Sequence, residues 1–177
     1  MTTTLDAKSG TSGSVPIEIS GIFISPAHDF KGHHGKPRGE HPVKALEIVA
    51  CVAGKGLVGD RYFGFKDDFI GQITFFDVAV FEAIRRRFDC PDLQPSVFRR
   101  NVITEGIDLN ALISRRFRIN DVEFMGSVEC APCHWMDLAV ASGVEQFMKG
   151  RGGLRARITA SGSLAKGSQT LVVLPVL

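Results

Sequence analysis

The sequence predicts a mainly β protein in which short strands form a barrel or a strongly bent antiparallel sheet with helices at its rim.

 Three observations predict this class. Strand-like segments recur along the chain, glycine-rich turns separate them, and only two segments have the spacing of apolar residues that is typical of a helix. A doubly wound α/β fold would instead alternate strands with a similar number of helices.

The predicted elements follow one another with few long connections. Strands are predicted at residues 17–25, 43–52, 71–76, 99–104, 117–119, 122–128, 155–160 and 170–174. Asp77 is expected to cap a helix that runs to about Phe88, a helical turn is expected over residues 108–112, and a second helix is expected over residues 136–148. Asn120-Asp121 predicts a hairpin turn, and a Gly/Ser turn is expected between the last two strands.

The length of 177 residues predicts one domain with a single core. Residues 1–16, rich in Thr, Ser and Gly, are expected to form a flexible tail, and residues 17–177 the domain. The first residues lack a charged start followed by an apolar stretch, so no secretory signal is expected. No apolar run reaches the ~18 residues of a membrane span. We therefore expect no membrane partner, a cytoplasmic location and reduced cysteines.

The charge pattern argues against a nucleic-acid partner. The net charge is +2, and the densest basic cluster, Arg85-Arg86-Arg87, lies in the first predicted helix, where a solvated face is expected. No basic stripe alternates with aromatic residues. The loop from Pro26 to Pro42 holds four of the five histidines (His28, His33, His34 and His41). Loops of this length are often functional, so these side chains are candidates for the rim of a site as well as for plain surface groups.

The segment Cys130-Ala131-Pro132-Cys133-His134 carries the most reactive chemistry of the chain. Four interpretations fit its spacing: half of a zinc site, a dithiol redox pair, a c-type haem attachment, or a loop in which one thiol acts. Zinc normally requires a second pair of soft ligands, whereas Cys51 and Cys90 are isolated and are expected to be small buried hydrophobic residues. A redox pair normally opens a helix in a βαβ unit, and haem attachment normally requires export. Pro132 would present Cys133 from a rigid turn if one thiol acts.

Six segments together resemble the MOSC domain, named for the C-terminal domain of molybdenum cofactor sulfurase. They are Gly54-Lys55-Gly56-Leu57-Val58-Gly59-Asp60-Arg61, Gln72-Ile73-Thr74, Phe98-Arg99-Arg100-Asn101-Val102-Ile103, Gly106-Ile107-Asp108-Leu109-Asn110-Ala111-Leu112, Pro132-Cys133 and Gly152-Gly153-Leu154-Arg155-Ala156-Arg157. They occur in the family's order over about residues 17 to 174. The resemblance implies a β-barrel-like fold, in agreement with the strand pattern.

The resemblance also implies a site for the pterin-based molybdenum cofactor or for sulfur, with Cys133 as the metal ligand and reactive residue. Arg99 and Asn101 match family positions that hold the cofactor, and Asp77 begins the helix near it. The loop residues Gly59, Asp60 and Arg61 are further candidates for cofactor contacts. Arg61 has the charge to bind an anion, and a surface ion pair with Asp60 is the alternative. A carboxylate at Asp77, where family members often have serine, would partly oppose a phosphate at this helix end.

Two functions from different classes follow from the resemblance. The first is an oxidoreductase, or a component of one, that reduces N-hydroxylated or other oxygen-bearing small molecules at a Cys-ligated molybdenum. It needs an external reductase as electron donor, since the chain shows no nucleotide-binding fingerprint. The second is a sulfur carrier that receives sulfur from a donor and holds a persulfide on Cys133. A module that stores or hands over the cofactor is a third hypothesis. No pyridoxal phosphate is expected on this chain.

Overall fold

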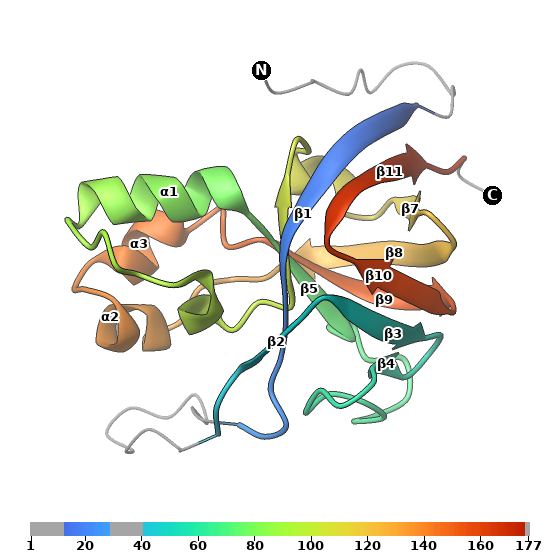
Figure 1. Ribbon diagram of the computed structural model, residues 1–177, viewed down its shortest axis with the longest axis horizontal. Coiled ribbons are helices and arrows are strands. Elements are labelled where there is room, and N and C mark those ends of the chain that lie inside the picture. The colour runs from blue at the N-terminus through green and yellow to red at the C-terminus, as the bar shows by residue number, and fades with distance from the viewer. Residues whose placement is uncertain (1–12, 29–40, 176–177) are drawn as a thin grey trace.

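A closed barrel forms most of the molecule. The computed structural model describes residues 13–28 and 41–175. Seven of its strands close in the order β11-β7-β8-β9-β5-β6-β1, and β1 pairs back onto β11. The helices lie together on one side of this barrel (Figure 1). The barrel strands are β1 (Ser14–Ile24), β5 (Ile73–Asp77), β6 (Val102–Glu105), β7 (Arg116–Ile119), β8 (Val122–Glu129), β9 (Leu154–Ala160) and β11 (Gly167–Val173). The predicted fold class is confirmed.

The predicted strand at residues 43–52 is divided between two sheets. It forms β2 (Lys44–Leu46), which extends the large sheet beside β1, and β3 (Ile48–Val52), which enters a small sheet of order β10-β3-β4. The other members of this small sheet are β4 (Gly56–Leu57) and β10 (Gly162–Ala165). The prediction of a Gly/Ser turn in place of β10 was wrong, because pairing with β3 outweighs the low strand propensity of glycine and serine.

One pair of barrel strands is parallel, in contrast to the antiparallel pattern predicted. β5 and β6 run in the same direction and are hydrogen-bonded along Phe75–Asp77. Parallel neighbours require a crossover connection, and α1 (Val78–Arg87) is in that connection. The helix begins as predicted, because the Asp77 carboxylate accepts a hydrogen bond of 2.8 Å from the backbone N–H of Ala79.

Two hydrophobic cores lie on opposite sides of the β5–β6 wall. Successive strand residues point to opposite faces. Phe75 and Val102 therefore point into the barrel, whereas Phe76 and Ile103 point outward to the helices. The barrel core includes the aromatic contacts of Phe75 with Phe117 and Phe124. The barrel and the helices therefore share the β5–β6 wall, and the candidate site lies close to it.

The predicted helix at residues 136–148 is two short helices, α2 (Trp135–Ala139) and α3 (Val144–Met148). The chain turns at Gly143, whose φ of +93° is in the left-handed region that favours glycine. The Asp137 side chain then accepts a 2.7 Å hydrogen bond from the backbone N–H of Glu145. Trp135, Met136, Val144 and Met148 are buried against α1 and the outer face of the wall. Two 3-10 turns, η1 (Pro95–Phe98) and η2 (Leu109–Leu112), complete the described elements.

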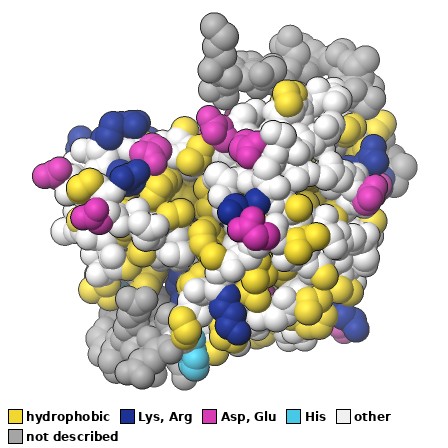
Figure 2. Space-filling view, in the orientation of Figure 1, with side chains coloured by type: hydrophobic (Ala, Val, Ile, Leu, Met, Phe, Trp, Pro, Cys, Tyr) yellow, Lys and Arg dark blue, Asp and Glu magenta, His cyan; other side chains and the backbone are white. Residues whose placement is uncertain are grey.

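The surface carries mixed charge. Basic side chains gather over α1, and acidic side chains lie beside them (Figure 2). Arg85, Arg86 and Arg87 occupy the last turn of that helix, where cations offset the negative end of the helix dipole. Among the described residues, no helix has the length and apolar character needed to cross a bilayer.

Candidate functional site

A cationic cavity of about 170 Å³ lies where the Cys130–His134 segment meets the barrel. Four arginines line it, and the lining that the structure describes contains no aspartate or glutamate. Four large aromatic side chains form much of the remaining wall. The lining residues are His28, Arg61, Tyr62, Phe69, Gly71, Thr74, Phe98, Arg99, Arg100, Cys130, Ala131, Cys133, Trp135, Met136 and Arg155. Such a site favours an anionic ligand with a planar or apolar part.

Cys133 and Cys130 differ in exposure although both line this cavity. Cys133 is exposed, whereas Cys130 is 3% exposed. Residues 130–133 have no regular secondary structure, and both thiols are free. The exposed Cys133 is thus the thiol that a ligand can reach.

Arg100 anchors the Cys130 segment. Its buried guanidinium donates to three backbone carbonyls, those of Gly152 (3.0 Å), Phe98 (3.0 Å) and Cys130 (2.8 Å). The backbone N–H of Cys130 in turn donates to the carbonyl of Gly153 at 2.7 Å. Because these bonds use the three nitrogens of the guanidinium, Arg100 acts by positioning the segment that carries Cys133.

The Gly152-Gly153 pair lets two segments approach this closely. A Cβ at Gly152 would lie 2.4 Å from the carbonyl oxygen of Cys130. A Cβ at Gly153 would lie 2.1 Å from the carbonyl oxygen of Phe75, and Gly153 has a φ of +99°. Both distances are far inside van der Waals contact. The glycine pair noted in the sequence therefore has a steric role beside the cavity.

Arg99 reaches the cavity from a left-handed backbone conformation. The sequence predicted a strand from residue 99, but β6 begins at Val102 and Arg99 has a φ of +55° at the end of η1. Residues other than glycine adopt this conformation at a cost of about 1–3 kcal/mol. The guanidinium donates to the Ser25 hydroxyl and to the carbonyl of Ala27, both at 3.0 Å. These bonds hold Arg99 against the end of β1 on the cavity wall.

Arg61 also lines the cavity, whereas the neighbouring Asp60 does not. Asp60 is 6% exposed and accepts hydrogen bonds from the backbone N–H groups of Ser25 and Tyr62, both at 3.1 Å. Arg61 lies 3.6 Å from the same carboxylate and 4.8 Å from the Tyr62 ring centroid. Its Nε is buried without a hydrogen-bond partner. Gly59 and Asp60, predicted as cofactor contacts, are outside the lining, so the structure gives Asp60 a positioning role.

Asn101 lies beneath the cavity and does not line it. Its side-chain oxygen accepts from the backbone N–H and the hydroxyl of Thr74, at 3.0 and 2.8 Å. Its amide nitrogen donates to the carbonyl of Phe23 and to Asp60, at 3.1 and 3.3 Å. The amide is therefore occupied within the protein. Asn101 ties three segments together where the sequence had suggested a direct contact with the cofactor.

Asp77 is likewise absent from the cavity lining. It caps α1, and burial together with the nearby Asp108 and Glu105 carboxylates raises its pKa, against a smaller opposite effect of the Ala79 hydrogen bond. The Asp77 carboxylate already occupies the backbone N–H of Ala79 at this helix end. The helix end at Asp77, predicted as a phosphate site, therefore does not line the cavity that contains Cys133.

Arg155 lines the cavity and was not among the residues predicted from the sequence. It lies on β9 between the buried Leu154 and Ala156 and opposite Thr74 on β5. Its Nε is buried without a partner, and no hydrogen bond or ion pair joins its side chain to the described residues. The alternation of β9 was a usable signal, because it places Arg155 on the face opposite the barrel core. Tyr62, Phe69, Phe98 and Trp135 were also missed as cavity walls.

The remaining sequence candidates are dispersed. His28 lines the cavity with its ring 5.1 Å from that of Tyr62, His41 is exposed, and His33 and His34 fall outside the described residues. Cys51 is buried in the barrel core and Cys90 is half-buried. Within the described part of the chain, one cluster of potential metal ligands occurs, and it includes neither Cys130 nor Cys133. The zinc interpretation of the cysteine segment therefore gains no support.

Comparison with known proteins agrees with this architecture. The YuaD protein from Bacillus subtilis superposes with a TM-score of 0.71 at 18% identity, over 94% of this chain and 100% of that one. YiiM from Escherichia coli superposes with a TM-score of 0.63 at 17% identity, over 93% of this chain and 71% of that one. YiiM from Geobacillus stearothermophilus superposes with a TM-score of 0.63 at 15% identity, over 89% of this chain and 75% of that one. No curated protein matches the sequence significantly. The sequence profile of the MOSC domain matches residues 60–170, more than half of the chain, which therefore belongs to the MOSC domain family.

Proposed function

We propose that this protein binds the pterin-based molybdenum cofactor with the Cys133 thiolate as metal ligand, and reduces N-hydroxylated or other oxygen-bearing small molecules, alone or as a component. MOSC domains are generally associated with this cofactor. The observation that carries the proposal is the pairing of an exposed thiol with a cavity lined by four arginines and, among the described residues, no carboxylate. A soft thiolate suits molybdenum, and guanidinium groups suit a phosphate.

The donor set of the cavity fits an anionic group. Arg61 and Arg155 each bury an Nε that has no hydrogen-bond partner. A buried donor left unsatisfied costs about 1–3 kcal/mol, and phosphate oxygens would satisfy it. The cavity volume of about 170 Å³ is below the roughly 300–1,000 Å³ of sites that enclose a drug-sized ligand. We infer that the cavity receives the charged or metal-bearing part of the cofactor, while the rest lies at its mouth.

The residues of the chain have separate tasks in this proposal. Bound cofactor would supply a metal that exchanges two electrons with the substrate. Cys133 would hold that metal, and Arg100 fixes the segment on which Cys133 lies. Tyr62 and Phe69 cover the cavity and exclude water. For an N-hydroxylated substrate, the N–O bond breaks and two electrons and two protons give the amine and water; the electrons come from an external reductase.

A sulfur-carrier function is the second candidate, and the exposure of Cys133 favours it. A persulfide has to form on an accessible thiol and has to be reached again by its acceptor. Cys133 meets this requirement, whereas the nearly buried Cys130 does not. This function needs a sulfur donor, and it requires neither the pterin nor the metal.

One purification distinguishes the two functions. The full chain, Cys133→Ala and the matched variant Cys130→Ala are isolated from a host that makes the cofactor, and molybdenum, pterin and sulfane sulfur are measured per chain. The cofactor function predicts metal and pterin near one per chain, lost in Cys133→Ala and retained in Cys130→Ala. Sulfane sulfur on Cys133 without metal identifies the carrier. Neither signal, in protein that is folded, contradicts both functions.

A further inference from the structure

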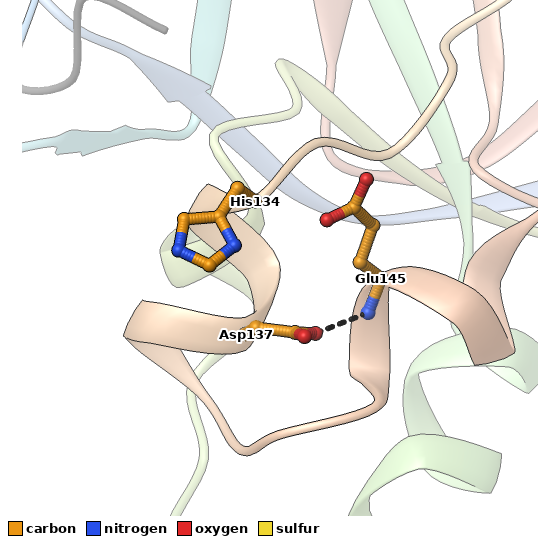
Figure 3. A group of neighbouring side chains, drawn as sticks. All are labelled: His134, Asp137 and Glu145. Atoms are coloured by element: carbon orange, nitrogen blue, oxygen red, sulfur yellow. Dashed lines mark hydrogen bonds between the residues drawn. The ribbon is translucent and has the colours of Figure 1, made fainter. Parts of the chain in front are cut away.

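The residues His134, Asp137 and Glu145 form a cluster outside the cavity (Figure 3). One ring nitrogen and one oxygen from each carboxylate all lie within 4.8 Å of one another, and each residue is half-buried. The three residues come from the start of α2, its first turn and the first turn of α3. None of them lines the cavity that holds Cys133.

The protein builds this cluster without help from an ion. His134 and Asp137 are three residues apart, so they share one face of α2. Asp137 is then held by its 2.7 Å hydrogen bond from the backbone N–H of Glu145 (Figure 3). The same bond brings the Glu145 side chain beside the other two. The arrangement therefore depends on the backbone of α3, and a ligand would find its donors already gathered.

The two carboxylates of the cluster have no arginine or lysine partner among the described residues. None of the ion pairs formed there by arginine or lysine involves Asp137 or Glu145. A cation bound between the two carboxylates would interact favourably with both. Several basic residues pair with other carboxylates, as Arg85 does with Glu82.

We propose that His134, Asp137 and Glu145 bind a divalent transition-metal ion of the zinc type. One imidazole and two carboxylates are suitable ligands for such an ion, with water in the remaining positions. Calcium is disfavoured, because it takes six to eight oxygen ligands. Ligand atoms of one tetrahedral zinc ion are about 3.3–3.6 Å apart, so the pair farthest apart in the cluster has to close by up to about 1.3 Å on binding. The bound ion links the start of α2, next to Cys133, to α3.

The test is calorimetric titration of the full, tag-free chain with Zn²⁺, followed by the same titration of four variants. Glu145→Gln removes the charge and leaves the backbone donor to Asp137 in place, and His134→Gln removes the imidazole. Cys133→Ala removes the exposed thiol, and Glu82→Gln is a matched carboxylate change on α1. We expect one site per chain, weakened at least tenfold in Glu145→Gln and His134→Gln and unchanged in Cys133→Ala and Glu82→Gln.

Cobalt spectroscopy and thermal unfolding test the proposed site further. Co²⁺ in the same site should show d–d absorption without a thiolate-to-cobalt charge-transfer band. The same concentration of Zn²⁺ should raise the Tm of the full chain more than that of Glu145→Gln, because stabilisation of the folded state grows with binding affinity. Absence of a site, its persistence in both ligand variants, or its loss in Cys133→Ala overturns the proposal. These outcomes are independent of whether Cys133 binds molybdenum.

Discussion

The side-chain amide of Asn101 donates a hydrogen bond of 3.3 Å to the buried carboxylate of Asp60. Through this bond the start of β6 is joined to the glycine loop that carries Arg61. Asp60 also accepts from the backbone of Ser25, so the end of β1 belongs to the same network. Two residues that the sequence presents as cofactor contacts thus hold together the segments that surround the cavity.

Asn101→Ala is expected to destabilise the fold by about 2–4 kcal/mol. The change removes the side-chain partner of the Thr74 backbone N–H and of the Phe23 carbonyl and one of the hydrogen bonds to Asp60, and each group left unsatisfied costs about 1–3 kcal/mol. Urea unfolding measures the difference. Asn110→Ala is the control, because Asn110 is exposed and its side chain donates only to the carbonyl of Gly150. Equal stability of the two variants would show that the Asn101 network is dispensable.

Gly153→Ala is expected to cost about 3 kcal/mol or more, whereas Gly167→Ala should cost about 1–2 kcal/mol. Both residues have a φ of +99°, so the backbone strain of an alanine is matched. Only at Gly153 does the new Cβ meet another group, the carbonyl oxygen of Phe75 at 2.1 Å, and overpacking adds its own cost. Thermal and urea unfolding of the two variants provide the comparison. A similar loss of stability in both variants would contradict the steric role of Gly153.

The sequence predicted the fold class and most strands because apolar alternation reports directly which face is buried. The division of residues 43–52 at Glu47 was not predictable, since it depends on β10, a partner more than a hundred residues away. For the site, the motifs led to Cys133, Arg61 and Arg99. They did not separate residues that line the cavity from those behind it, because Asp60 and Asn101 are in the same motifs and their hydrogen bonds form only in the folded chain.

Cys51 should make stability fall at alkaline pH. Burial raises the pKa of this thiol to about 12, from an ordinary value of 9.0. Between these values the unfolded chain loses the proton and the folded chain keeps it. The contribution of Cys51 to the free energy of unfolding is therefore fully present below pH 9. It declines toward pH 12, by at most about 1.4 kcal/mol per pH unit. Urea unfolding of the full chain and Cys51→Ala from pH 8 to 11 should give a shallower decline for the variant; parallel curves would rule out this contribution.

Arg155→Met is expected to stabilise the cofactor-free protein slightly, by up to about 1 kcal/mol, and to weaken cofactor retention. The variant removes a guanidinium whose buried Nε has no partner, and in the proposed function it also removes an anion contact. Arg157→Met is the control two residues along β9, where the arginine pairs with Asp68. Unfolding and cofactor content are measured for both. A destabilised Arg155→Met protein with full cofactor content would contradict the role given to Arg155.

In the proposed function, the Cys133 thiolate binds molybdenum. X-ray absorption at the molybdenum edge, on protein loaded with cofactor, counts the sulfur atoms around the metal. We expect one fewer sulfur ligand, with an oxygen or nitrogen in its place, in Cys133→Ser than in the full chain, and no change in Cys130→Ser. An unchanged sulfur count in Cys133→Ser, or wild-type protein that takes up no molybdenum when the cofactor is supplied, would contradict it.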